Sequence, residues 1–223
     1  MLTKGNRLNI KVILADDHDL VRTGVRRLLE DNTDIEVIAE ATTGEEAVSC
    51  CRQHAPHVVL MDINMPGMGG MEATKKILNH NDVIKVIIVT MNDDEILAQK
   101  LLKIGAAGYL TKGCKITEII HAIKEVMANR RYITPEIAQQ LALAQSRPDS
   151  ALSPFQDLSE RELQVMMMVL EGRKTNEISD SLCLSPKTIS TYRHRLFCKL
   201  GIQSDVELTR LAISQGLFSQ SEK

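Results

Sequence analysis

Five side chains that can do chemistry each follow a short apolar run of this sequence. Asp16 and Asp17 follow the first run, Asp62 the third, Thr90 the fourth and Lys112 the fifth. One Asp at the end of a run is usually a turn-former or a helix cap. Three carboxylates, a hydroxyl and an ammonium at four such ends favour a functional site instead.

The chemistry of this set follows from its charges. Clustered carboxylates repel one another unless a hard cation lies among them, and Mg²⁺ suits carboxylate and carbonyl oxygens. A carboxylate beside a metal can attack a phosphoryl group and form an acyl phosphate. Mg²⁺, Lys112 and Thr90 could then stabilise the transferred oxygens. We predict that Asp62, which ends the central run, is the nucleophile, and that Asp16 and Asp17 anchor Mg²⁺.

The elements that must position these residues follow a repeat. Residues 10–128 contain a β-branched apolar run and then a helical stretch, five times over; the runs are residues 10–15, 35–39, 57–61, 85–89 and 108–111. Short connections predict a parallel sheet with helices on both faces, since right-handed crossovers return each helix to the sheet. The ends of parallel strands share one edge, where such sheets bind ligands. We predict an α/β doubly wound (βα)5 domain over residues 1–128.

Composition limits the classes of protein. The chain has 223 residues, 43% hydrophobic and 25% charged, which fits a globular protein of one or two domains. It has no apolar run long enough to span a bilayer, and its start lacks the apolar core of a signal peptide. The five cysteines form no C-x-x-C pair, so we expect reduced thiols. We expect a cytoplasmic protein with no membrane contact.

A second domain follows a linker. Residues 129–157 include a short helix that starts near Pro135 and a Ser- and Pro-rich stretch at 145–154, which predicts a mobile linker. Residues 158–223 are predicted to be an all-α four-helix domain. Ser159 to Glu162 forms a capping box, residues 176–182 a short helix, and Ser185-Pro186 starts a third helix that ends near 199. Two short helices joined by a tight turn indicate a helix-turn-helix.

The third of these helices is basic. It carries Lys187, Arg193, Arg195 and Lys199, and no acid occurs between 186 and 200. The net charge of −2 gives no basic field over the whole protein, so a nucleic-acid site must be local. A basic face beside a helix-turn-helix is typical of duplex DNA binding. The alternative is an ordinary solvated basic face.

Residues 10–128 resemble the receiver domain of bacterial two-component response regulators. The matching residues are Asp16, Asp17, Asp62, Met65, Pro66, Gly70, Thr90, Tyr109 and Lys112. The resemblance implies that Asp62 accepts a phosphoryl group from a histidine kinase or a phosphotransfer protein. It also implies that Asp17, Asp62 and the backbone carbonyl of Asn64 bind Mg²⁺, with Asp16 acting through water.

The same resemblance assigns the phosphate contacts. It implies that Lys112 pairs with the phosphate and that Thr90 and Tyr109 form a switch pair; alternatively, Tyr109 is a buried aromatic that fills space. Met91, which follows Thr90, is larger than the Ala or Gly often found there. We hypothesise that Met91 restricts the access of water to the phosphoryl group.

Residues 158–218 resemble the LuxR-type output domain of the NarL/FixJ family. The resemblance rests on the motifs Leu158-Ser-Glu-Arg-Glu-Leu and Leu184-Ser-Pro-Lys-Thr-Ile-Ser. Taken as a whole, the chain resembles the GacA/UvrY/LetA group of that family. The resemblance implies that Ser190, Thr191 and His194 face base edges. Residues implied to hold phosphates or lie beside them are Lys187, Thr188, Arg193, Arg195 and Lys199. The last helix, residues 205–215, would form a dimer contact through Val206, Leu208, Leu211 and Ala212. Alternatively, this helix buries its apolar stripe within the domain.

The leading hypothesis is a transcription factor switched by phosphorylation of Asp62. As a dimer it would bind double-stranded promoter DNA and act on RNA polymerase, and its cognate sensor histidine kinase would be of the hybrid type. One rival is a phosphatase of the haloacid dehalogenase type, which needs a second Asp two residues after the nucleophile. Asn64 stands there instead, so we predict that the protein is not an enzyme. A second rival hypothesis keeps the receiver domain but assigns residues 158–218 to a protein- or RNA-binding module.

Overall fold

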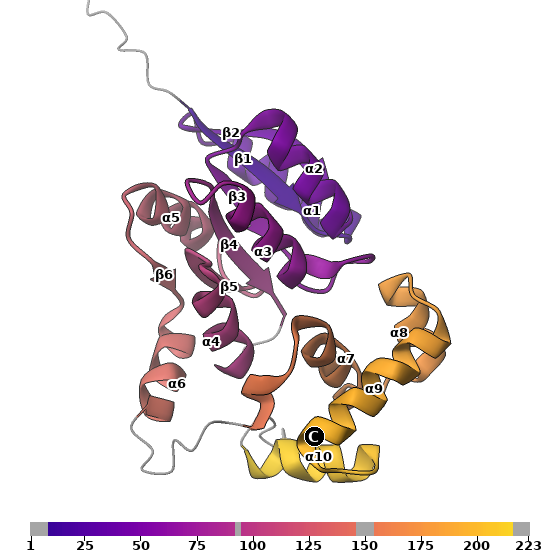
Figure 1. Ribbon diagram of the computed structural model, residues 1–223. Helices are drawn as coiled ribbons and strands as arrows, with labels where there is room; N and C mark the ends of the chain where they lie inside the picture. The colour runs from indigo at the N-terminus through magenta and orange to yellow at the C-terminus, as the bar shows by residue number, and fades with distance from the viewer. Residues whose placement is uncertain (1–8, 92–94, 146–153, 216–223) are drawn as a thin grey trace, which may run out of the picture. The chain divides into compact units, whose positions relative to one another are not determined.

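The chain forms two compact units in a computed structural model that describes residues 9–91, 95–145 and 154–215 (Figure 1). When residues are grouped by the contacts between them, one unit comprises residues 1–93 and 101–134, and the other comprises residues 94–100 and 135–223. Residues 129–134, which we expected in the linker, therefore belong to the first unit. The predicted Ser- and Pro-rich stretch falls largely on 146–153, outside the described residues.

The first unit is built on a parallel sheet of six strands in the order β2-β1-β3-β4-β5-β6. The strands are β1 (Ile10–Ala15), β2 (Ile35–Ala41), β3 (Val58–Met61), β4 (Lys85–Thr90), β5 (Gly108–Thr111) and β6 (Tyr132–Ile133). The predicted doubly wound class is confirmed, and the first five strands are those expected. The sixth was not expected. Its two residues pair with Gly108 and Tyr109 of β5.

Helices cover both faces of this sheet. They are α1 (Asp19–Glu30), α2 (Gly44–His54), α3 (Gly69–His80) and α5 (Ile116–Met127); α4 (Glu95–Ile104) begins among residues grouped with the second unit and ends in the first. Helices α1 and α5 pack together, and so do α2 and α3. Leu29 of α1 and Ile123 of α5 share one buried cluster with Leu14, Leu60 and other strand residues. Successive strand side chains alternate between faces, so residues such as Ile13 lie toward the opposite side.

The second unit is helical in its described part. It contains α6 (Pro135–Gln145), a 3₁₀ turn at Pro154–Asp157, α7 (Glu160–Leu170), α8 (Thr175–Leu182), α9 (Pro186–Leu200) and α10 (Asp205–Ser214). The capping box of Ser159 and Glu162 is present, and Ser185 caps α9 with Pro186 in its first turn, as predicted. Cys183 takes a left-handed conformation, φ 51°, between α8 and α9. Helix α9 packs on both α7 and α8.

Within the parts of the chain that are described, each helix is too short or too polar to cross a bilayer.

Candidate functional site

The register of the sheet brings the predicted site residues to one edge. Ala15 pairs with Met61, Met61 with Ile88, and Thr90 with Thr111. The backbone ladder continues past the strands, because Asp62 N–H donates to the carbonyl of Ala15 at 2.8 Å and Lys112 N–H to that of Thr90 at 2.7 Å. Asp16, Asp62, Thr90 and Lys112 therefore lie together at the carboxyl ends of β1, β3, β4 and β5.

The ammonium of Lys112 joins two of the carboxylates. Its Nζ lies 2.8 Å from Asp16 Oδ2 and 2.8 Å from Asp62 Oδ2. The side chains of Lys112 and Asp62 are only 7% and 2% exposed, so little water screens this contact. The second oxygen of Asp62, Oδ1, accepts a hydrogen bond from Asn64 N–H at 3.3 Å. Asp62 is thus held at both oxygens.

Burial disfavours the charged forms of both Asp62 and Lys112. It raises the pKa of Asp62 above the ordinary value; Lys112 lowers it in part, and the charge of Asp16 raises it further. Burial also lowers the pKa of Lys112, but the hydrogen bonds to Asp16 and Asp62 outweigh it and the pKa is raised. Lys112 therefore stays an ammonium at neutral pH. One ammonium serves two carboxylates, which leaves negative charge that a cation can neutralise.

The oxygens of the site fit a divalent cation. Carboxylate oxygens of Asp16, Asp17 and Asp62 and a ring nitrogen of His18 all lie within 4.8 Å of one another. Asp17 Oδ1 is buried and makes no hydrogen bond, although His18 Nδ1 lies 2.9 Å away. A buried carboxylate oxygen that makes no hydrogen bond, in a converging set of oxygens, suits Mg²⁺. Sequence reasoning missed His18, although it directly follows the two aspartates.

Gly70 of α3 allows the loop after Asp62 to close tightly. A Cβ at residue 70 would lie 1.8 Å from the carbonyl oxygen of Asp62, which no side chain could tolerate. Gly70 N–H also donates to the carbonyl of Ile63 at 2.9 Å. The glycine in the matched motif is therefore a steric requirement for placing Asp62.

The predicted switch residues are buried. Thr90 and Tyr109 are both 0% exposed, and Tyr109 is among the largest fully buried side chains. The ring therefore fills space in this conformation, as the alternative interpretation holds, and its role in switching stays a prediction. Met91 is 74% exposed, at the surface beside the site.

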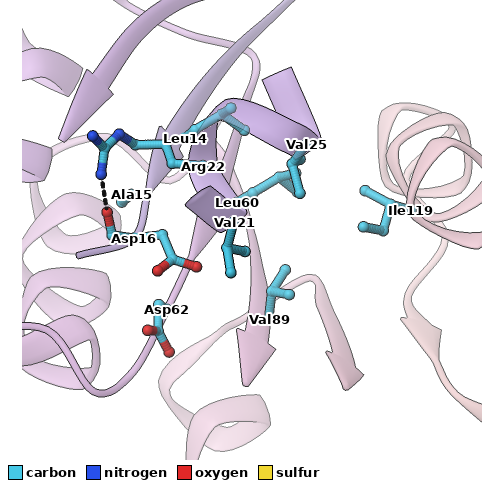
Figure 2. A pocket seen from close by; sticks show the side chains of 10 residues that line it. All are labelled: Leu14, Ala15, Asp16, Val21, Arg22, Val25, Leu60, Asp62, Val89 and Ile119. Atoms are coloured by element: carbon cyan, nitrogen blue, oxygen red, sulfur yellow. Dashed lines mark hydrogen bonds between the residues drawn. The ribbon is translucent and has the colours of Figure 1, made fainter. Parts of the chain in front are cut away.

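A small cavity lies next to the acidic residues, between α1, α5 and the sheet (Figure 2). Its volume is about 30 Å³, and Val21, Val25, Leu60 and other apolar side chains line it beside Asp16 and Asp62. This volume is enough for water but not for an organic ligand.

Helix α9 presents a polar face. Lys187, Ser190, Thr191, His194 and Arg195 are exposed, and Thr188 is half-buried. The Ser190 and Thr191 hydroxyls each donate to a backbone carbonyl four residues earlier, at 2.9 Å. Residues 187, 190, 191 and 194 follow the spacing of one helical face. They form one surface that could enter a groove.

Two basic residues of α9 are engaged inside the domain. Arg193 donates from Nη2 to both carboxylate oxygens of Asp205 at 2.6 Å and from Nη1 to Thr175 Oγ1 at 3.1 Å. Lys199 donates to Glu162 Oε2 at 2.7 Å and to the carbonyl of Asp157 at 3.1 Å. Both residues tie α9 to neighbouring elements, which the charge pattern alone did not indicate.

The predicted dimer residues of α10 divide into two groups. Leu208 and Ala212 are 0% exposed, and α10 packs on α7, so these two lie in the core of the domain. That is the placement expected by the alternative interpretation. Leu211 is half-buried, and Val206 is 62% exposed. A surface contact through α10 would therefore use Val206 and the exposed Ile213 rather than the buried pair.

An acidic site at the edge of a parallel sheet, joined to a helical unit with an exposed polar helix, is the arrangement expected of a receiver with a DNA-binding output domain. Comparisons with known proteins agree. The family model of the response regulator receiver domain matches residues 12–124, and that of bacterial regulatory proteins of the luxR family matches residues 156–212.

Whole-chain relatives are also found. The chain is 53% identical over 208 residues to response regulator UvrY of Escherichia coli (strain K12), covering 93% of this chain and 95% of that protein. It is 50% identical over 208 residues to response regulator GacA of Pseudomonas aeruginosa, covering 93% and 97%. The structure of RcsB from Salmonella enterica serovar Typhimurium, bound to a promoter with the phosphomimetic BeF₃⁻, is similar with a TM-score of 0.59 and 27% identity, covering 93% and 99%.

This chain belongs to the response regulators that carry a luxR-type DNA-binding domain, and it is a transcription regulator.

Proposed function

We propose that Asp62 is the phosphoacceptor of this regulator and that phosphorylation there controls its binding to promoter DNA as a dimer. The observation that carries the proposal is the buried Lys112 ammonium, which contacts Asp62 and Asp16 at 2.8 Å beside an Asp17 oxygen that makes no hydrogen bond. The sequence suggested a receiver of residues 1–128, a linker of 129–157 and a DNA-binding domain of 158–223; because β6 pairs with β5, the receiver would extend to residue 134 and the linker would begin there.

The reaction is an in-line transfer. A carboxylate oxygen of Asp62 attacks the phosphorus of a phosphohistidine, an O–P bond forms, and the N–P bond breaks to release the imidazole of the kinase or phosphotransfer protein. Mg²⁺, when bound by Asp16, Asp17, Asp62 and Asn64, supplies positive charge to the transferred oxygens. The ammonium of Lys112 would leave its contact with Asp62 to pair with a phosphoryl oxygen, and the hydroxyl of Thr90 would donate to another.

The receiver domain and the luxR-type domain support a kinase and promoter DNA as partners. The donor would be a cognate sensor histidine kinase of the hybrid type, and the output would reach RNA polymerase in the cytoplasm. A related regulator, RcsB, has been solved as two dimers bound to two parallel DNAs. On α9, Ser190, Thr191 and His194 would read base edges, and Lys187 and Arg195 would contact phosphates. Thr188, Arg193 and Lys199 would lie beside the phosphates. To bind a phosphate directly, Arg193 would first have to release Asp205, and Lys199 would have to release Glu162.

Under this proposal the protein does not act as a phosphatase that turns over a substrate. A phosphatase of the haloacid dehalogenase type would use an acid/base two residues after the nucleophile, and Asn64 cannot transfer that proton. Sustained hydrolysis of small phosphomonoesters by the purified protein would contradict this part of the proposal.

The test compares the full-length protein with Asp62→Asn, using acetyl phosphate and Mg²⁺. We expect the parent to take up one phosphoryl group per chain, detected by intact-mass spectrometry, and to bind promoter DNA more tightly afterwards. Asp62→Asn should do neither, whereas Asp82→Asn, at an exposed aspartate of the same unit, should behave like the parent. Uptake of a phosphoryl group by Asp62→Asn at the parental level would refute the assignment.

A further inference from the structure

We propose that Arg22 of α1 is a positioning residue for the metal site, and that it acts by holding the backbone between Asp16 and Asp17. The inference rests on the proposed function, because it concerns the affinity of that site for Mg²⁺. Neither the motifs nor the resemblance assigned any role to Arg22.

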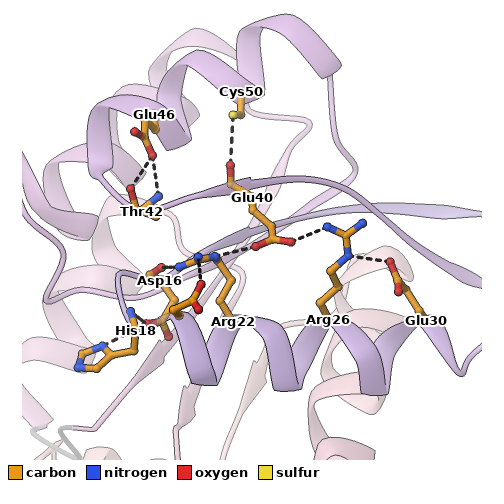
Figure 3. Close-up of polar contacts among 10 residues, drawn as sticks. Asp16, His18, Arg22, Arg26, Glu30, Glu40, Thr42, Glu46 and Cys50 are labelled. Atoms are coloured by element: carbon orange, nitrogen blue, oxygen red, sulfur yellow. Dashed lines mark hydrogen bonds and ion pairs between the residues drawn. The ribbon is translucent and has the colours of Figure 1, made fainter.

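Arg22 makes three hydrogen bonds, one of which reaches the loop of Asp16 and Asp17, called the acidic loop here (Figure 3). Its Nη1 donates to the carbonyl oxygen of Asp16 at 2.8 Å, Nε donates to Glu40 Oε2 at 2.7 Å, and Nη2 donates to Asp19 Oδ1 at 2.6 Å. Its side chain is only 11% exposed. One guanidinium therefore links α1, the end of β2 and the loop after β1.

The carbonyl of Asp16 is the informative contact. It belongs to the peptide that joins Asp16 to Asp17, so its direction determines how both side chains leave the backbone. The N–H of Asp16 is held from the other side by the carbonyl of Ala41, at 3.0 Å. Arg22 touches no carboxylate oxygen of Asp16 or Asp17, and thus it shapes the site without occupying it.

Glu40 holds the guanidinium in place. Its Oε2 accepts from Arg22, and its Oε1 accepts from Arg26 Nη1 at 2.5 Å. These arginines, Arg26 most strongly, lower the pKa of Glu40 against the opposing effect of burial, so Glu40 is a carboxylate at neutral pH. Cys50 Sγ donates to the backbone carbonyl of Glu40 at 3.8 Å and ties it to α2.

Charge balance makes this arrangement compatible with a cation. A lone arginine beside the acidic set would repel Mg²⁺, but the carboxylates of Glu40 and Asp19 neutralise it. The loop gains an anchor and the site keeps its negative charge. Groups that orient the ligands of a metal typically contribute about 10- to 100-fold to metal affinity.

The experiment measures Mg²⁺ binding to the full-length protein by calorimetric titration, and separately the Mg²⁺ concentration that half-saturates phosphoryl uptake from acetyl phosphate. For Arg22→Ala we expect affinity about tenfold weaker or more. The maximal uptake rate at saturating Mg²⁺ should stay near that of the parent, because Asp62 and Lys112 are untouched. A merely structural role would lower the maximal rate and leave the half-saturating concentration unchanged.

Arg26→Ala is the matched control. Arg26 lies one turn further along α1 and pairs with the same Glu40, but it contacts no group of the acidic loop. Its Mg²⁺ affinity should equal that of the parent. Equal weakening by Arg26→Ala and Arg22→Ala, or unchanged affinity in Arg22→Ala, would overturn the inference.

A second variant covers the case in which Arg22→Ala does not fold by circular dichroism. Glu40→Gln keeps the guanidinium but removes the carboxylate that orients and neutralises it, so Mg²⁺ affinity should fall in the same direction. Unchanged affinity there would overturn the inference. If the parent itself neither binds Mg²⁺ nor takes up a phosphoryl group, the proposed function fails as well; if only the variants are normal, the inference about Arg22 fails alone.

Discussion

Replacing Lys112 with Met should destabilise the first unit, because Asp16 and Asp62 would lose the one ammonium that both carboxylates contact. The parent places Lys112 Nζ 2.8 Å from Asp16 and 2.8 Å from Asp62. Removing one partner of a buried ion pair typically costs about 3–5 kcal/mol. Because the lysine side chain is 7% exposed, solvent screening reduces this little. We therefore expect Lys112→Met to lower the stability of the first unit by about 3 kcal/mol at pH 7 without Mg²⁺.

Hydrogen–deuterium exchange is the suitable assay, since a chain of two units need not unfold in one step. The slowest amides of β1 and β3 report the opening of their own unit, and about 3 kcal/mol corresponds to about a hundredfold faster exchange. Excess Mg²⁺ should recover much of the loss, because the cation takes over the neutralising role of the ammonium. Lys124→Met, at an exposed lysine of α5, is the matched control and should change stability by less than about 0.5 kcal/mol.

The sign of the pH dependence gives a second check. Burial raises the folded-state pKa of Asp62 above its unfolded value, and Lys112 opposes that rise. Without Lys112 the pKa rises further, and stability is lost as pH increases through this folded-state pKa. Acidification from neutral pH should therefore reduce the difference in unfolding free energy between Lys112→Met and the parent. Equal exchange rates in Lys112→Met and the parent without Mg²⁺ at pH 7 would refute the reasoning.

Four further substitutions have expected outcomes. Gly70→Ala should cost about 1–3 kcal/mol and impair phosphoryl uptake, since the new Cβ would lie 1.8 Å from the Asp62 carbonyl; exchange and intact mass measure the two effects. Met91→Ala should shorten the lifetime of the phosphorylated protein, followed by mass spectrometry, and an unchanged lifetime would remove Met91 as a barrier to water. On α10, Val206→Asp should weaken self-association in analytical ultracentrifugation without unfolding, whereas Leu208→Ala should cost about 2–5 kcal/mol in stability; the opposite pattern would contradict the burial of Leu208.

The strand-edge site could be predicted because it depends on local patterns. Parallel strands end at one edge, so the order of apolar runs was enough to bring Asp16, Asp62, Thr90 and Lys112 together. The starts of α7 and α9 were equally local, since Ser159 and Ser185 cap the turns that directly follow them.

What the sequence did not show depends on contacts between distant residues. Strand β6 has only two residues, too few for an alternating pattern, and exists because β5 offers a free edge. The pairing of Arg193 with Asp205, and that of Lys199 with Glu162, requires knowing which elements are neighbours. A charge count along α9 could only add these two residues to the basic face. The pairing of Arg22 with Glu40 on β2 was hidden for the same reason.

Strand β6 also decides where the first unit can be cut. It covers the outer edge of β5, and just beyond it Thr134 N–H donates to the carbonyl of Tyr109 at 3.2 Å. A fragment ending at residue 128 would leave the backbone groups of β5 unpaired, and an open strand edge is a template for pairing with another chain. Such a fragment should aggregate more readily than one ending at residue 134, and self-association measured on it would report a severed edge rather than a physiological interface.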